Sequence, residues 1–77
     1  MKEIFPRITI DTTIKAGKPV IQGTRVPVDL IVAKIAGGMT TEEVMNEYQL
    51  TRDDVLAALK YASRILSSET IITGSTA

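Results

Sequence analysis

The residues with the clearest potential for chemistry lie in the run 17–28, which combines chain bends with positive charge. These twelve residues hold two glycines, two prolines and two cations: Gly17, Gly23, Pro19, Pro27, Lys18 and Arg25. Glycine bends expose backbone N–H groups, and cations beside them attract phosphate. Lys18 and Arg25 are therefore candidate nucleic-acid contacts. The same run also fits a plain loop in which Arg25 pairs with Asp29 or another carboxylate, and both interpretations stay open.

A second set of candidate nucleic-acid contacts follows the last stretch of helical periodicity. Arg52, Lys60 and Arg64 are the cations of that stretch. Asp53 and Asp54 stand at its start, where a DNA-reading helix touches bases and where carboxylates face phosphates at a cost. Only the three cations therefore favour DNA binding by this helix.

Carboxylates gather in the segment just before it, at Glu42, Glu43 and Glu47. Glu43 and Glu47 are one helical turn apart and would suit a basic partner protein, although Glu43 also fits a helix cap and the others a solvated face. The sequence has no His and no Cys, so we expect no metal and no cofactor. No base accompanies the serines, so we expect no catalytic residues and no small-molecule substrate.

Three helices must position these side chains. Apolar residues at helical spacing predict a helix from Val28 to Ala36, ended by two glycines. Thr40 and Thr51, each followed three residues later by a carboxylate, predict helices over 41–48 and 52–66. The last helix is expected to bury its apolar positions Val55, Leu56, Leu59, Ala62, Ile65 and Leu66. Short helices joined by a tight turn are typical of a helix-turn-helix unit, and the same pattern also fits a plain packing unit.

The flanks complete a single domain over residues 1–77. Alternating β-branched residues predict a ribbon of two or three short strands over 4–27. Residues 67–77 are rich in Ser and Thr and predict a flexible tail, in which 70–73 forms a strand only if a partner supplies an edge. The predicted fold class is mainly α: a three-helix helix-turn-helix bundle over 28–66 with a short N-terminal β-ribbon.

Composition limits the oligomeric state, the cellular location and the partners expected for the domain. The chain has 77 residues, zero formal net charge and no Cys. So small a core is only marginally stable alone, which favours a homodimer or docking on a partner. The lack of disulfides and of an apolar membrane or signal segment predicts a soluble, cytoplasmic protein with no membrane partner. Residues 1–28 are basic overall and residues 29–58 acidic, which suits self-association or partners of opposite charge.

Several of these segments together closely resemble the prokaryotic family called domain of unknown function 433. They are Gly17–Val28, Gly37–Val44, Leu50-Thr51 and Val55–Ala62, so the likeness covers roughly residues 7–63. The resemblance implies a homeodomain-like three-helix fold with an N-terminal β-ribbon. It also implies a role similar to that of VapB-type antitoxins, which act beside a PIN-like ribonuclease toxin. It carries over no catalytic residue, and it gives the residues of the Gly-Lys-Pro and Gly-Thr-Arg motifs no role beyond structure.

The sequence thus favours a non-enzymatic antitoxin that neutralises a PIN-like ribonuclease and represses its own operon as a dimer on operator DNA. Glu43 and Glu47 would meet the toxin, and the flexible tail would fold onto it. One alternative is a stand-alone DNA-binding regulator that uses Arg52, Lys60 and Arg64. The other is a structural dimerisation module.

Overall fold

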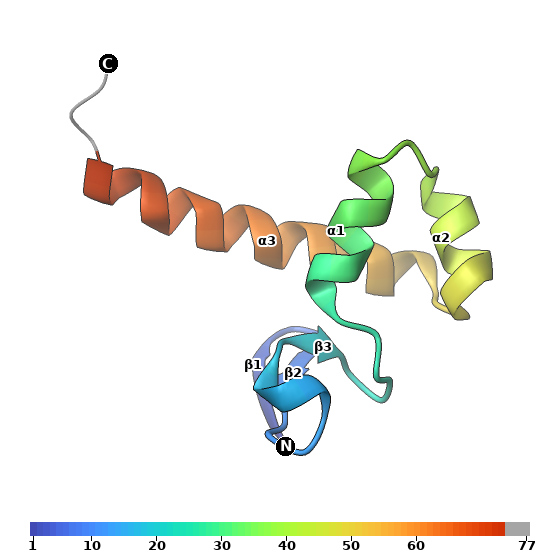
Figure 1. Cartoon of the computed structure of the whole chain (residues 1–77), viewed down its shortest axis with the longest axis horizontal. Coiled ribbons are helices and arrows are strands. Elements are labelled where there is room, and N and C mark those ends of the chain that lie inside the picture. Colours follow the sequence, from blue (N-terminus) through green and yellow to red (C-terminus); the bar gives the residue numbers. More distant parts are fainter. Residues whose placement is uncertain (74–77) are drawn as a thin grey trace.

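Three helices stand over a small three-stranded sheet in the computed structural model, which describes residues 1–73 and the side chains of residues 1–68 (Figure 1). The helices are α1 (Val28–Ala36), α2 (Thr41–Tyr48) and α3 (Arg52–Thr73). The strands are β1 (Lys2–Phe5), β2 (Ile8–Ile10) and β3 (Val20–Ile21), and a left-handed turn, η1 (Lys15–Gly17), lies between β2 and β3. The predicted fold class, mainly α with an N-terminal β-ribbon, is confirmed.

The sheet is antiparallel throughout, in the order β1-β2-β3. It begins at Lys2 rather than at residue 4, because β1 pairs with β2 through the two-residue turn Pro6-Arg7. Arg7 adopts a φ of +70°, a conformation that usually selects Gly or Asn. The arginine at this position means that the sequence carries no Gly or Asn signal for the turn.

The predicted helix boundaries within 28–52 are confirmed, and local hydrogen bonds explain them. Thr40 and Glu43 form a reciprocal capping box at the start of α2, with distances of 3.1 Å and 2.8 Å. Thr51 and Asp54 form the same arrangement at the start of α3, with both distances at 3.1 Å. Gly38, with a φ of +109°, supplies the left-handed residue just after α1.

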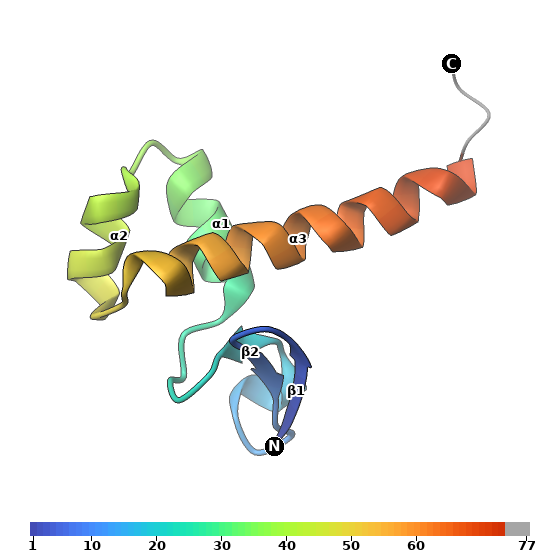
Figure 2. The same ribbon diagram turned by 180° about the vertical axis from the view of Figure 1, so that it is seen from behind.

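The core lies where α1 and α2 pack on the first half of α3, with the sheet below (Figure 2). Phe5 of β1 meets Tyr61 of α3 with ring centroids 5.6 Å apart, which joins the sheet to the long helix. The buried side chains that form one cluster are Ile8, Ile21, Val28, Ile31, Val44, Leu50, Val55, Ala57 and Ala58.

The last helix is longer than predicted. It continues to Thr73 instead of ending at Leu66, so residues 67–73 are helical rather than a flexible tail or a strand. No Gly or Pro occurs between Arg52 and Thr73, and nothing in the sequence therefore stops the helix before Gly74. The remainder of the predicted tail, 74–77, lies outside the described residues.

The apolar stripe of α3 is also only partly buried. Val55 is fully buried, but Ile65 is 41% exposed and Leu66 is 61% exposed, so the prediction that these two pack in the core is wrong. The reason is the way the helices cross, because α1 runs steeply across α3 instead of alongside it and leaves the second half of α3 uncovered (Figure 1). Beyond the crossing with α1, the second half of α3 projects away from the body (Figure 2).

Candidate functional site

The acidic start of α3 is held by an arginine from the sheet. The Arg7 guanidinium donates to the Asp54 carboxylate at 3.0 Å and lies 3.7 Å from that of Asp53. Asp54 also accepts from the backbone N–H of Thr51. Burial alone raises the pKa of Asp54, but the hydrogen bonds from Thr51 and Arg7 outweigh it and hold the pKa below the ordinary aspartate value. Asp54 is thus an internal structural carboxylate.

One of the three predicted α3 cations, Lys60, lies next to this ion pair. Lys60 lines a shallow hollow of about 240 Å³ together with Arg7 and Asp53, and Arg64 follows Lys60 one helical turn later. Arg52 stands two turns before Lys60. All three side chains are exposed and form no ion pair within the described residues. Arg7 is the cation that sequence inspection missed.

The cations of the glycine-rich run lie elsewhere. Lys18 donates to Asp29 of α1 at 3.0 Å, and both side chains are more than half exposed. Asp29 is thus paired with Lys18 and not with Arg25, the partner that one of the two interpretations of this run gave it. Arg25 is exposed on the loop between β3 and α1 and has no ion pair in the described part of the chain. No ion pair or hydrogen bond of that part connects these two cations with those of α3.

The Gly-Thr-Arg portion of the motif shapes this loop. Gly23 has a φ of +78°, which favours glycine. The Thr24 hydroxyl donates to the Ile21 carbonyl at 2.8 Å and accepts from the Val26 N–H at 3.0 Å. These contacts fix the loop that connects β3 to α1, so the motif has a structural role.

The predicted partner-binding carboxylates differ in what they do. The Glu43 carboxylate accepts from the backbone N–H of Thr40 and so caps α2. Glu42 and Glu47 are exposed on α2 and form no ion pair within the described residues. Glu42 and Glu47 are therefore the freer carboxylates of this helix.

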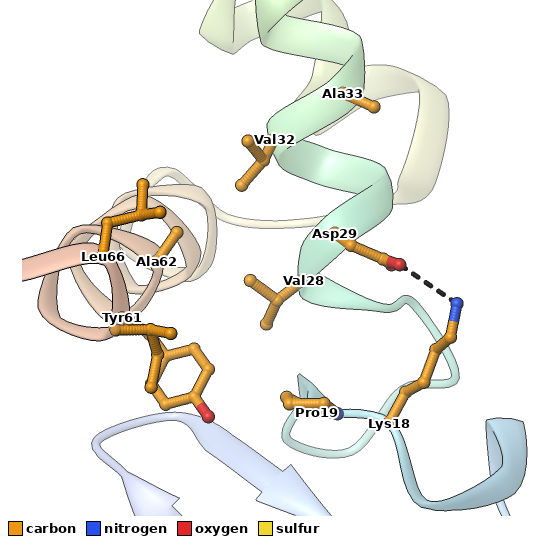
Figure 3. Close-up of a pocket in the computed structure, with 10 residues that line it drawn as sticks. Lys18, Pro19, Val28, Asp29, Val32, Ala33, Tyr61, Ala62 and Leu66 are labelled. Carbon is orange, nitrogen blue, oxygen red and sulfur yellow. Dashed lines mark hydrogen bonds and ion pairs between the residues drawn. The ribbon is translucent and has the colours of Figure 1, made fainter. Parts of the chain in front are cut away.

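An apolar groove between α1 and the second half of α3 was not predicted (Figure 3). Its volume is about 430 Å³. Val28 and Val32 of α1 face Tyr61, Ala62 and Leu66 of α3 across it, and the Lys18–Asp29 ion pair lies at its rim. Ile65 and Leu66 form part of the groove wall, and they are exposed because α1 does not cover this part of α3.

Other kinds of site have no support in the described residues. No three acidic side chains there lie close enough together to hold a metal ion. None of the helices described has the length and apolar character needed to cross a lipid bilayer.

The fold and its surfaces define a small helix-turn-helix domain joined to an N-terminal β-ribbon. The chain belongs to the DUF433 family, described as "Protein of unknown function (DUF433)", whose model matches residues 8–62. The resemblance found in the sequence is thereby confirmed. No curated protein matches the chain.

Two solved structures are similar to it. A DUF433 member protein from Anabaena variabilis superposes with a TM-score of 0.74 and 30% identity over 80% of this chain. Rv2018 from Mycobacterium tuberculosis superposes with a TM-score of 0.62 and 29% identity over 68% of this chain. The present chain spans 62% of the first protein and 24% of the second.

Proposed function

We propose that this chain is a non-enzymatic, antitoxin-like protein that binds and neutralises a PIN-like ribonuclease in the cytoplasm. The observation that carries the proposal is the exposed acidic surface of α2, where Glu42 and Glu47 point about 140° apart around the helix and neither has an ion-pair partner in the described residues. A ribonuclease needs a cationic surface to bind RNA, and an acidic helix complements such a surface. A protein bound there would exclude the RNA substrate.

Because Glu43 caps α2, a substitution at Glu43 would alter helix stability as well as any contact with a partner. Reversing Glu43 to Lys would remove a helix cap, with a cost of about 1 kcal/mol that has nothing to do with a partner. The informative variant is therefore the double substitution Glu42→Gln/Glu47→Gln, with Glu43 left in place.

The experiment measures inhibition of the PIN-like ribonuclease encoded beside this gene, using the purified full-length chain. We expect a stable complex, inhibited RNA cleavage, and inhibition at least about tenfold weaker for Glu42→Gln/Glu47→Gln, a loss of ~1.4 kcal/mol. The control Gln22→Lys/Ser68→Lys changes net charge by the same amount at exposed positions on other surfaces and should inhibit normally. Absence of both complex and inhibition would refute the proposal. Unchanged inhibition by the double variant would refute the assignment of the α2 carboxylates as the contact with the ribonuclease.

A second candidate function, repression of the operon by DNA binding, is favoured by the Arg7 contacts. Because Arg7 pairs with Asp53 and Asp54, the carboxylates at the start of α3 repel phosphate less than the sequence suggests. Lys60 and Arg64 then follow on exposed positions of the same helix. The salt dependence of DNA binding tests this candidate.

A further inference from the structure

The apolar groove between α1 and α3 is used by neither proposed function. We infer that it is the contact surface of a homodimer, in which α3 of a second copy lies antiparallel across it near Leu66. The inference concerns the chain alone and does not rest on the antitoxin proposal. Three observations carry it: a continuous apolar seam, the absence of unbalanced charge, and surplus surface.

The apolar seam runs along α3 from the buried core of a single copy to its exposed surface. Val55, Leu59, Ala62 and Leu66 follow one another at spacings of four, three and four residues, the a/d spacing of a coiled coil. Val55 is fully buried by its own chain, whereas Leu66 is 61% exposed. The dimer would therefore extend a contact surface that the fold already uses.

Among the residues with described side chains, the charged ones that line the groove are Lys18 and Asp29, which pair with each other at 3.0 Å and so present no unbalanced charge to a second copy. A matching partner must be apolar and helical. Apart from Met1 and Ile4 near the N-terminus, the large exposed apolar side chains of the described residues are Ile65 and Leu66. A second copy thus offers the segment the groove requires, in a self-complementary, two-fold arrangement.

The chain also exposes more surface than its size requires. Its accessible surface is 5264 Å², whereas a compact monomer of 8.4 kDa has about 4,600 Å². The surplus is roughly 650 Å². Each partner in a standard interface covers about 800 Å². The surplus therefore fits a small interface whose dimer dissociates on dilution.

The test is the molar mass of the full-length chain in solution, measured by light scattering up to about 1 mM. We expect mass to rise from monomer to dimer with concentration. Leu66→Asp should stay monomeric while keeping its helical circular dichroism, because Leu66 is exposed in the monomer. Ser68→Asp adds the same charge about 200° further round the helix and should still dimerise.

A cross-linking measurement checks the geometry independently of stability. The chain has no Cys, so Leu66→Cys introduces a single thiol. Near a two-fold axis this thiol should form an intermolecular disulfide on mild oxidation, whereas Ser68→Cys should not.

Three outcomes would overturn the inference. They are a wild-type chain that is monomeric at every concentration, a dimer that Leu66→Asp leaves intact, and equal cross-linking of the two Cys variants. Loss of the dimer in Ile4→Asp but not in Leu66→Asp would assign the interface to the free edge of β1 instead.

Discussion

At the residue scale, Arg7 connects parts of the chain that are 47 residues apart. It occupies a turn conformation that favours Gly, with a φ of +70°, and its side chain binds the carboxylates at the start of α3. The turn conformation costs about 1 kcal/mol for an L-residue. The hydrogen bond to the mostly buried Asp54 offsets that cost and ties the sheet to the helix-turn-helix unit.

Asp54 should make stability depend on pH. Its pKa is lowered in the folded state, so its contribution is present above the unfolded value, about 3.9, and is lost as pH falls through the folded value. Asp54→Asn should lower the free energy of unfolding by about 1 kcal/mol at pH 7 and flatten its decline in acid. Urea titrations at several pH values measure both effects. Asp53→Asn, a change at a mostly exposed carboxylate, is the control, and an equal effect of the two would contradict the assignment.

Gln49 should be a position where a glycine stabilises the protein. It ends α2 with a φ of +58°, and its side chain makes only one exposed 3.3 Å contact with the Asn46 carbonyl. Gln49→Gly should raise the free energy of unfolding by about 0.5–1 kcal/mol. This is the left-handed backbone strain that glycine removes, minus the additional chain entropy that glycine loses on folding. Thermal denaturation measures the change. Asn46→Gly, inside α2, should instead destabilise by a few tenths of a kcal/mol.

At the scale of elements, the steep crossing of α1 over α3 divides the long helix into a buried half and a projecting half. Residues of the first half pack against α1 and α2, and residues of the second half form the wall of the groove. The same apolar stripe therefore belongs to the core where α1 covers it and to the groove wall where α1 does not.

Substitutions on either side of this division should differ sharply in cost. Ile31 of α1 is fully buried, so Ile31→Ala should cost about 2–5 kcal/mol, enough to unfold much of so small a domain. Leu66→Ala removes an exposed side chain and should cost less than about 0.5 kcal/mol when the chain is dilute and monomeric. Urea denaturation at low protein concentration compares the two. Similar costs would show that Leu66 is buried in the monomer after all.

At the scale of the whole molecule, the charged surfaces lie on different elements. The exposed carboxylates Glu42 and Glu47 are on α2, and the exposed cations Lys60 and Arg64 are on α3, where Lys60 lies near Arg7. A neutral chain of this kind can meet a basic protein and a polyanion at different surfaces.

If the chain binds its operator through α3, the salt dependence of binding should identify the contacts. Lys60→Ala and Arg64→Ala should each reduce the slope of log affinity against log salt by about 0.9. Lys34→Ala removes an exposed cation of α1 and should leave the slope unchanged. Fluorescence anisotropy over a salt series measures it. Equal slopes for all of these variants would show that α3 is not the DNA-binding element.

The sequence by itself determined the features that depend on neighbouring residues. The capping pairs Thr40–Glu43 and Thr51–Asp54 and the glycines after Ala36 set helix boundaries through contacts spanning only a few residues, so spacing alone revealed them. The family resemblance, which rests on the same short motifs, was confirmed as well.

Only the tertiary structure decided the pairing and burial of residues far apart. Arg7 rather than solvent meets Asp54, Lys18 rather than Arg25 meets Asp29, and Leu66 lies outside the core that its periodicity predicted. Helical periodicity marks which face of α3 is apolar, but whether that face is covered depends on where α1 crosses it and ends. That depends on the relative placement of two helices, a property that no local pattern in the chain encodes.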